Sequence, residues 1–147
     1  MSIDHERFMR IALEEAARSK AEGNSAVGSV IVHGETVVAR GRNLVDSTYD
    51  PTAHAETVAI REAGAALRQV AFPGYRLYTT FEPCPMCCGA ILASDIMTLV
   101  MGARHVSGES RWGGYTVEKL IDLAGRNGTL EVVTGILTQA CADIRYA

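Results

Sequence analysis

The chain has 147 residues, of which 48% are hydrophobic and 21% are charged. This composition is typical of one globular domain over residues 1–147 and excludes disordered, collagenous and coiled-coil proteins. The net charge of −3 gives no sign of a basic surface for nucleic acid or membranes. We expect no membrane span, since no apolar run is long enough, and no signal or transit peptide. A cytoplasmic protein with reduced thiols is therefore expected.

Hydrophobic periodicity and turn residues divide the first half of the chain into a helix, a hairpin and a second helix. We expect a helix over 4–22, strands over 26–32 and 36–42 with a turn at 33–35, and a polar loop over 43–48. Asp50-Pro51 indicates the next helix start, because aspartate caps helices and proline suits the first helical position. This helix is predicted to end near Leu67.

Short apolar strands alternate with helices in the second half. We expect a turn at 72–74, a strand over 76–80, a helix over 85–94, a strand over 98–102, a glycine-rich loop over 107–114, a helix over 116–124, a strand over 130–134 and a helix over 137–146. Such alternation predicts an α/β protein whose central sheet is covered on both faces. The hairpin near the start makes the sheet mixed.

Residues suited to metal chemistry lie in two segments that each open a predicted helix. His54 and Glu56 lie in the first segment, and Cys84 and Cys87 lie in the second. One imidazole and two thiolates suit zinc and leave a fourth position for water. The two cysteines share a helix face, and a helix N-terminus favours the thiolate. A carboxylate beside zinc-bound water can move protons, which suits Glu56.

Other cysteines leave alternatives open. Cys88 follows Cys84 by four residues, so helical geometry alone would let it replace Cys87. Cys88 or Cys141 could also supply a fourth protein ligand, which would make a closed structural site. The usual fate of a free cysteine is that of a small buried apolar residue.

His54-Ala55-Glu56 and Pro83-Cys84-Pro85-Met86-Cys87 match the H-x-E and P-C-x-x-C signature of zinc deaminases. The chain resembles the cytidine deaminase superfamily along nearly its whole length. Further matching segments are residues 50–56, 77–87, 41–43 and 27–28. The resemblance is to the branch of guanine deaminase, fungal cytosine deaminase and tRNA adenosine deaminase. It implies a three-layer α/β/α sandwich with a five-stranded mixed central sheet, and a homodimer.

The same resemblance implies a Zn²⁺ cofactor held by His54, Cys84 and Cys87, which favours Cys87 over Cys88. It implies hydrolytic deamination, in which zinc hydroxide attacks the ring carbon that bears the amine and Glu56 shuttles protons to release ammonia. It also implies substrate contacts from the Asn43 side chain and from the backbone of Ala55 and Glu82. The alternative for Asn43, a turn residue, is less favoured.

Further candidates lie in the second half of the chain. Trp112, in the glycine-rich loop, could stack on a base or lie at the surface or a dimer contact. By analogy with C-terminal side chains of related enzymes, Asp143 could help to close the pocket, or it could lie on a solvated helix end. Three histidines without evident partners are expected at the surface: His5, His33 and His105.

The substrate prediction depends on charge and on one loop. The chain has two lysines and scattered arginines, and nucleic-acid affinity comes mainly from such groups. Residues 111–115 also depart from the pattern of tRNA enzymes. We therefore expect a small nucleobase, cytosine or guanine, and no nucleic-acid partner. The alternatives are a tRNA-specific adenosine deaminase, a deaminase of nucleosides or other amino-heterocycles, and a non-catalytic structural zinc domain.

Overall fold

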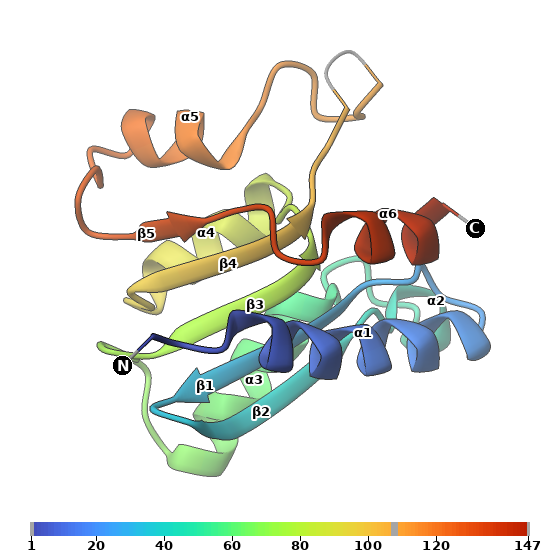
Figure 1. The fold of residues 1–147 in the computed structure, drawn as a ribbon, viewed down its shortest axis with the longest axis horizontal. Coiled ribbons are helices and arrows are strands. Elements are labelled where there is room, and N and C mark those ends of the chain that lie inside the picture. Colours follow the sequence, from blue (N-terminus) through green and yellow to red (C-terminus); the bar gives the residue numbers. More distant parts are fainter. Residues whose placement is uncertain (1, 107–108, 147) are drawn as a thin grey trace.

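The computed structural model describes residues 2–106 and 109–146. Eleven elements follow one another along these ranges (Figure 1): α1 His5–Ala21, β1 Gly28–His33, β2 Thr36–Arg42, α2 Val45–Thr48, α3 Ala55–Leu67, β3 Arg76–Phe81, α4 Pro85–Ala93, β4 Thr98–Ala103, α5 Val117–Leu123, β5 Glu131–Val133 and α6 Thr138–Tyr146. No helix in these ranges has the length and apolar character that crossing a bilayer requires. The cytoplasmic location stays a prediction.

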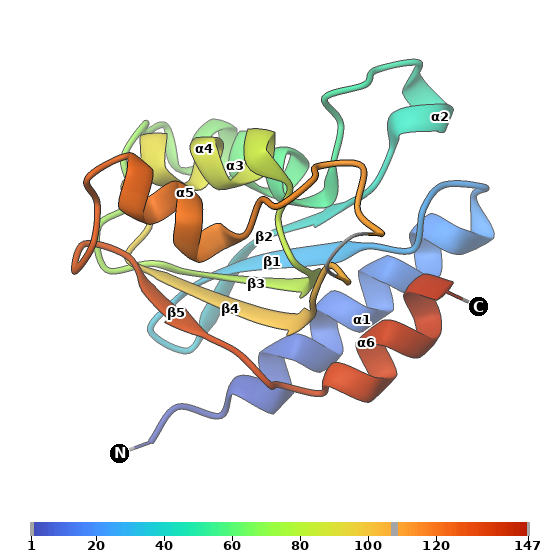
Figure 2. The ribbon, with the colours of Figure 1, turned by 90° about the horizontal axis from the view of Figure 1, so that it is seen from above.

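The strands form one five-stranded sheet in the order β2-β1-β3-β4-β5. β1 is antiparallel to both β2 and β3, whereas β3, β4 and β5 are parallel to one another. The hairpin therefore makes the sheet mixed, as the sequence predicts. Figure 2 shows α1 and α6 on one face of the sheet and α3, α4 and α5 on the other. The predicted three-layer α/β/α sandwich is confirmed.

Alternation along the strands builds a hydrophobic cluster on each face. Val30 and Val32 pack with α1 and α6, whereas Ile31 between them packs with α3 and α4. On the central strand β3, Leu77 packs in the cluster with α3 and α4, and Tyr78 packs in the cluster with α1 and α6. This is the period of two that a pleated strand imposes on its side chains. All six residues of β3 are buried, so this strand lies in the middle of the core.

Two predicted boundaries are wrong between β2 and α3. The predicted polar loop over 43–48 contains the short helix α2. The helix predicted to start at Asp50-Pro51 starts at Ala55. The Asp50 carboxylate accepts hydrogen bonds from the backbone N–H and hydroxyl of Thr52, and Ala53 N–H donates to Asp50 O, which closes a turn. Asp-Pro initiates turns as readily as helices, and here the turn leaves His54 as the N-cap of α3.

The other helices and strands lie within a few residues of their predicted bounds. Helix α5 is capped by the Thr116 hydroxyl, which accepts a hydrogen bond from Lys119 N–H. In the predicted glycine-rich loop, 109–114 consists of turns, and 107–108 lie outside the described residues.

Helix α3 lies directly on β2 at Gly41. An added Cβ at Gly41 would lie 2.2 Å from Ala55 O and 2.5 Å from Ala59 N. Only a residue without a side chain permits this separation. The contact fixes the first turn of α3, and with it His54 and Glu56, against the sheet.

We therefore expect Gly41→Ala to lower the free energy of unfolding by about 1–3 kcal/mol or more, because backbone rather than a flexible side chain would have to move. Gly89→Ala in α4 is the matched control, since nothing lies within 4 Å of its added Cβ. That change should be neutral or stabilise by up to about 1 kcal/mol through helix propensity. Urea denaturation measures both, and equal stability of the two variants would contradict the contact.

Candidate metal centre and active site

Two helix N-termini bring the three predicted metal ligands together. His54 is the N-cap of α3, and Cys84 is the N-cap of α4. Cys87 lies in the first turn of α4, which Pro85 and the bond from Cys88 N–H to Cys84 O (2.8 Å) initiate. The ligand atoms of His54, Cys84 and Cys87 all lie within 4.8 Å of one another. Cys88 and Cys141 are buried and lie outside this group.

The distances fit a tetrahedral zinc ion. His54 Nδ1 lies 3.5 Å from Cys84 Sγ, and two such ligands at ordinary zinc bond lengths are about 3.6 Å apart. Within the described ranges the group holds three residues, which leaves a fourth position for water or substrate. A closed structural site would need four protein ligands, so the donor set suits a catalytic zinc.

The two thiols share one proton unequally. Hydrogen bonding with Cys87 and with His54 lowers the pKa of Cys84, which therefore carries the thiolate. Hydrogen bonding with Cys84 and burial raise the pKa of Cys87. Metal binding needs both sulfurs deprotonated, so an arriving cation would displace this proton.

Glu56 lies beside the metal group in an almost fully buried position. Glu56 lies in the first turn of α3 and is 3% exposed. The Thr79 hydroxyl on β3 donates to Glu56 Oε1 at 3.2 Å. Burial and the nearby Cys84 thiolate raise the pKa of Glu56 to about 7. A carboxyl group of this kind can both take up and release a proton near neutral pH.

A cavity of about 270 Å³ opens beside these residues. Four of the five predicted substrate contacts line it: Asn43, Ala55, Glu82 and Trp112. Asp143 does not line it, because its side chain is exposed and accepts a hydrogen bond from Gln139. Arg145, two residues further along α6, lines the cavity instead. The substrate contacts themselves stay predictions.

The Glu82 carboxylate is fully engaged inside the protein. Arg104 donates two hydrogen bonds to it, and the backbone N–H groups of His105 and Val117 donate one each. This buried acceptor joins the end of β4 to the start of α5 and so supports the loop that carries Trp112. The backbone N–H of Glu82 also donates, to Ala103 O at 2.8 Å, so a substrate contact by the Glu82 backbone, which stays a prediction, would be made by its carbonyl oxygen.

Of the three histidines expected at the surface without partners, His33 is exposed and His5 and His105 are half-buried, and all three contact an aromatic side chain. His5 Nδ1 lies 2.8 Å from the Tyr78 hydroxyl, and His33 stacks on Tyr75. His105 lines the cavity, with its ring edge-on to Phe81 at 4.9 Å. Its position just after β4 is the sequence signal that could have placed it, since ligands bind at the carboxyl ends of parallel strands.

Arg111 and Arg145 were also missed by sequence reasoning, and both line the cavity. The Arg111 guanidinium stacks over Trp112 at 4.7 Å from the ring centroid, and Arg145 lies over Phe81 at 5.1 Å. They come from a loop and from the last turn of the chain, more than thirty residues apart. Nothing in the local sequence of either indicates that they share a cavity.

The chain is similar to zinc-dependent deaminases over most of its length. A family model for the cytidine and deoxycytidylate deaminase zinc-binding region matches residues 2–103. A tRNA-specific adenosine deaminase of Bacillus subtilis is 35% identical over 142 residues, which cover 97% of this chain and 86% of that protein.

Solved structures of deaminases are also similar to this chain. A structure from a study of A-to-I editing by tRNA:A34 deaminases superposes with a TM-score of 0.84 at 34% identity, covering 94% of this chain and 98% of that one. A guanine deaminase of Nitrosomonas europaea superposes with a TM-score of 0.81 at 29% identity, covering 99% of this chain and 85% of that one.

These comparisons overturn the partner prediction, which took a small nucleobase as the partner and excluded nucleic acid. Relatives matched over nearly their whole length are named for action on tRNA. Lysine count and net charge were poor guides, because they average over the surface, whereas Arg111 and Arg145 gather at one cavity. Of the predicted activities, the comparisons favour the alternative, tRNA-specific adenosine deamination, over cytosine or guanine. The predicted homodimer stays a prediction.

The ligand set predicts a contrast between two adjacent buried cysteines. We expect Cys87→Ala to reduce zinc content from about one ion per chain to near zero, because two protein ligands hold zinc poorly. Cys88→Ala is the matched control and should keep its zinc. Elemental analysis after dialysis measures both, and zinc loss on changing Cys88 instead would refute the assignment of Cys87.

Proposed function

The chain belongs to the cytidine and deoxycytidylate deaminase family, a family of zinc-dependent hydrolases, and on that premise we propose that it deaminates adenosine in tRNA. The observation that carries this proposal is the similarity to tRNA adenosine deaminases over nearly the full length of both partners. The solved relative comes from a study of editing at the wobble position of tRNA. An adenosine presented in an anticodon loop is therefore the proposed substrate.

We assign the metal to His54, Cys84 and Cys87, on the donor set and spacing described above. When bound, zinc would lower the pKa of a coordinated water to about 7, so that hydroxide is available at neutral pH. The protein contributes the three ligands, two of which, His54 and Cys84, line the cavity. Because the ligands come from two helix N-termini, α3 and α4 must keep their relative position for the site to work.

Glu56 is proposed as the proton carrier. It is buried beside the ligands, and its carboxyl group has a pKa of about 7. It can therefore accept a proton from the attacking water and deliver it to the ring nitrogen next to the reacting carbon. It can then move the second proton of that water, from the new hydroxyl group on the ring carbon, to the amine, which leaves as ammonia. The bond from the Thr79 hydroxyl to Oε1 orients this carboxylate oxygen.

Arg111 and Arg145 support a nucleic-acid substrate. Neither forms an ion pair within residues 2–106 and 109–146. By contrast, Arg18 and Arg42 pair with Glu15 and Glu22 and do not line the cavity. Unpaired guanidinium groups at a cavity are available to phosphates, which arginine binds with bidentate geometry. Trp112, held under Arg111, offers an aromatic face on which an unstacked base can lie.

The activity is tested by ammonia release from a tRNA anticodon stem-loop with adenosine at the wobble position. We expect turnover of this RNA, and a loss of at least about a hundredfold in Glu56→Gln, since general acid–base catalysis contributes about 10²–10⁴. The variant should keep its zinc. Free cytosine, guanine, adenine and their nucleosides form the comparison panel. Turnover of a free base with the stem-loop untouched would overturn the proposal.

The two arginines make a prediction about salt. We expect Arg111→Ala and Arg145→Ala each to weaken stem-loop binding and to reduce the slope of log K against log salt by about 0.7 per lost phosphate contact. Arg61→Ala serves as control, because Arg61 is exposed on α3 outside the active cavity. Fluorescence anisotropy at several salt concentrations gives the slopes. Slopes equal to that of the wild type in both variants would refute phosphate contacts by these residues.

A further inference from the structure

Three of the four polar groups of Asn43 are already committed within the protein. Its backbone N–H donates to Val27 O at 3.1 Å, and its backbone oxygen accepts from the Ser19 hydroxyl at 2.7 Å. Its side-chain Oδ1 accepts from Val45 N–H at 3.0 Å. A backbone N–H can only donate, so the amide atom that faces Val45 must be the oxygen.

The remaining group of Asn43 is the side-chain NH₂. It makes no hydrogen bond within the described part of the chain, and Asn43 lines the active cavity. The bond to Val45 prevents the amide from turning over, because a flip would place two donors face to face. Asn43 therefore offers a substrate two N–H donors and no acceptor.

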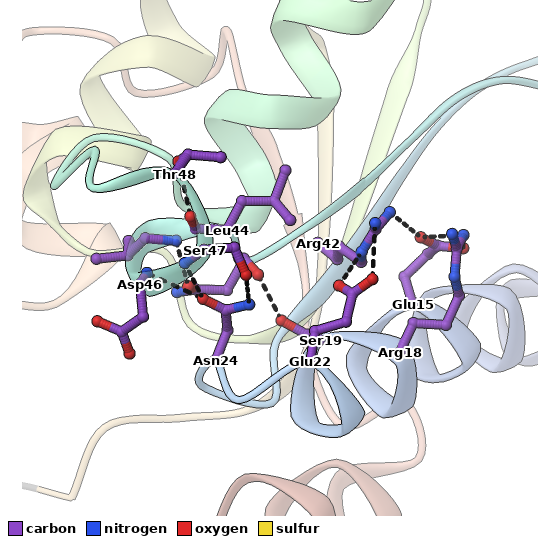
Figure 3. A network of polar contacts seen from close by, with 12 residues as sticks. Glu15, Arg18, Ser19, Glu22, Asn24, Arg42, Leu44, Asp46, Ser47 and Thr48 are labelled. Atoms are coloured by element: carbon purple, nitrogen blue, oxygen red, sulfur yellow. Dashed lines mark hydrogen bonds and ion pairs between the residues drawn. The ribbon is translucent and has the colours of Figure 1, made fainter.

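Ser19 holds the backbone of Asn43 from helix α1. Ser19 is fully buried, and its hydroxyl lies within hydrogen-bond distance of Asn43 O (2.7 Å) and of Ser25 O (2.9 Å). Its single proton serves both carbonyl groups. Figure 3 shows Ser19 on the last turns of α1, pointing toward the segment that follows β2.

Asn24 holds helix α2, which in turn fixes the Asn43 side chain. Asn24 Oδ1 accepts from the backbone N–H groups of Asp46 (2.9 Å) and Ser47 (3.1 Å), and its NH₂ donates to the Ser47 hydroxyl (2.7 Å; Figure 3). Val45, the partner of the Asn43 amide, is the first residue of this helix.

The residue before Asn43 is fixed as well. Arg42 donates two hydrogen bonds to the Glu22 carboxylate, at 2.6 and 3.0 Å, and lies 3.9 Å from the buried Glu15 (Figure 3). The end of α1 and the loop behind it thus hold Arg42, Asn43 and α2 together. None of the holding residues Glu15, Ser19, Glu22 and Asn24 lines the cavity.

We propose that Ser19 and Asn24 are positioning residues for base recognition, which fix Asn43 as a donor to a ring-nitrogen acceptor of the substrate base. The inference rests on the proposed function and deepens it. Adenine presents ring nitrogens as acceptors and its exocyclic amine as a donor. A donor-only amide can bind a ring nitrogen and cannot hold the amine that must leave, so the base is gripped away from the bond that breaks.

The experiment compares Ser19→Ala with Ser29→Ala. Ser29 is also fully buried, and its hydroxyl donates to Tyr78 O at the same distance of 2.7 Å, but it does not line the cavity or hold Asn43. We expect Ser19→Ala to lower kcat/KM on the stem-loop by about tenfold, mainly through KM, because a ground-state contact is weakened. Ser29→Ala should keep kcat/KM within about twofold at a similar loss of stability. Equal losses in the two variants would overturn the proposal.

A double-mutant cycle separates positioning from general damage. If Ser19 acts through Asn43, adding Ser19→Ala to Asn43→Ala should cost little further activity. Fully additive losses would mean that Ser19 acts elsewhere. Stem-loops with 3-deaza- or 7-deazaadenosine at the reacting position identify the acceptor, since each analogue lacks one ring nitrogen. We expect the wild type to be less active on one of the two analogues, and Asn43→Asp to lose no further activity on that analogue. A further loss in Asn43→Asp on both analogues would rule out a ring-nitrogen acceptor.

A measurement without substrate keeps this inference distinct from the proposed function. The NMR signals of the Asn43 side-chain amide are assigned by comparison with Asn43→Asp, whose spectrum lacks this pair. We expect this pair to shift or broaden in Ser19→Ala and to stay in place in Ser29→Ala. If the wild type fails to deaminate the stem-loop, the proposed function fails, while an undisturbed amide pair in Ser19→Ala would overturn the positioning role.

Discussion

The direct backbone contact of α3 with the sheet at Gly41 is the constraint on which the site depends. The helix can approach β2 this closely only because Gly41 has no side chain. The approach sets the height of the first turn of α3 above the sheet, and therefore the place of His54 and Glu56. Helix α4 needs no comparable device, since it starts four residues after β3 ends. The metal ligands meet because one helix is tied to the sheet by a short connection and the other by a glycine contact.

Charged groups serve different purposes in two parts of the molecule. Around α1 and β2, arginines and glutamates pair with one another, and around Glu82 a buried carboxylate holds the chain after β4. These charged groups are paired or hydrogen-bonded within the protein. At the cavity, Arg111 and Arg145 stack on aromatic rings, and neither forms an ion pair within residues 2–106 and 109–146. A count of charges along the sequence cannot distinguish these two uses, which is why a net charge of −3 misled the substrate prediction.

The sequence predicted the elements that periodicity determines and the chemistry that a compact motif carries. The strands are short and apolar, and the longer helices have helical periodicity, so ten of the eleven elements were expected close to where they lie. The start of α3 was misplaced because Asp50-Pro51 suits a turn as well as a helix start. The rim of the cavity escaped prediction for a different reason. His105, Arg111 and Arg145 lie on segments whose meeting depends on the packing of α6 beside β4, and no local pattern encodes it.

The fold itself does not decide the substrate. A tRNA adenosine deaminase and a guanine deaminase superpose on this chain almost equally well, so enzymes with different substrates share the helices that would hold the metal and the carboxylate. Discrimination must therefore come from groups outside that shared part. We propose that in this chain those groups are the amide of Asn43 and the aromatic and guanidinium groups of Trp112, Arg111 and Arg145, which all line the cavity. The amide can select an acceptor on the base, and the guanidinium groups can select the strand that carries it. Helix α1 supports the first function and the end of the chain supports the second. Because these supports are separate, the choice of substrate could change while the metal site stays the same.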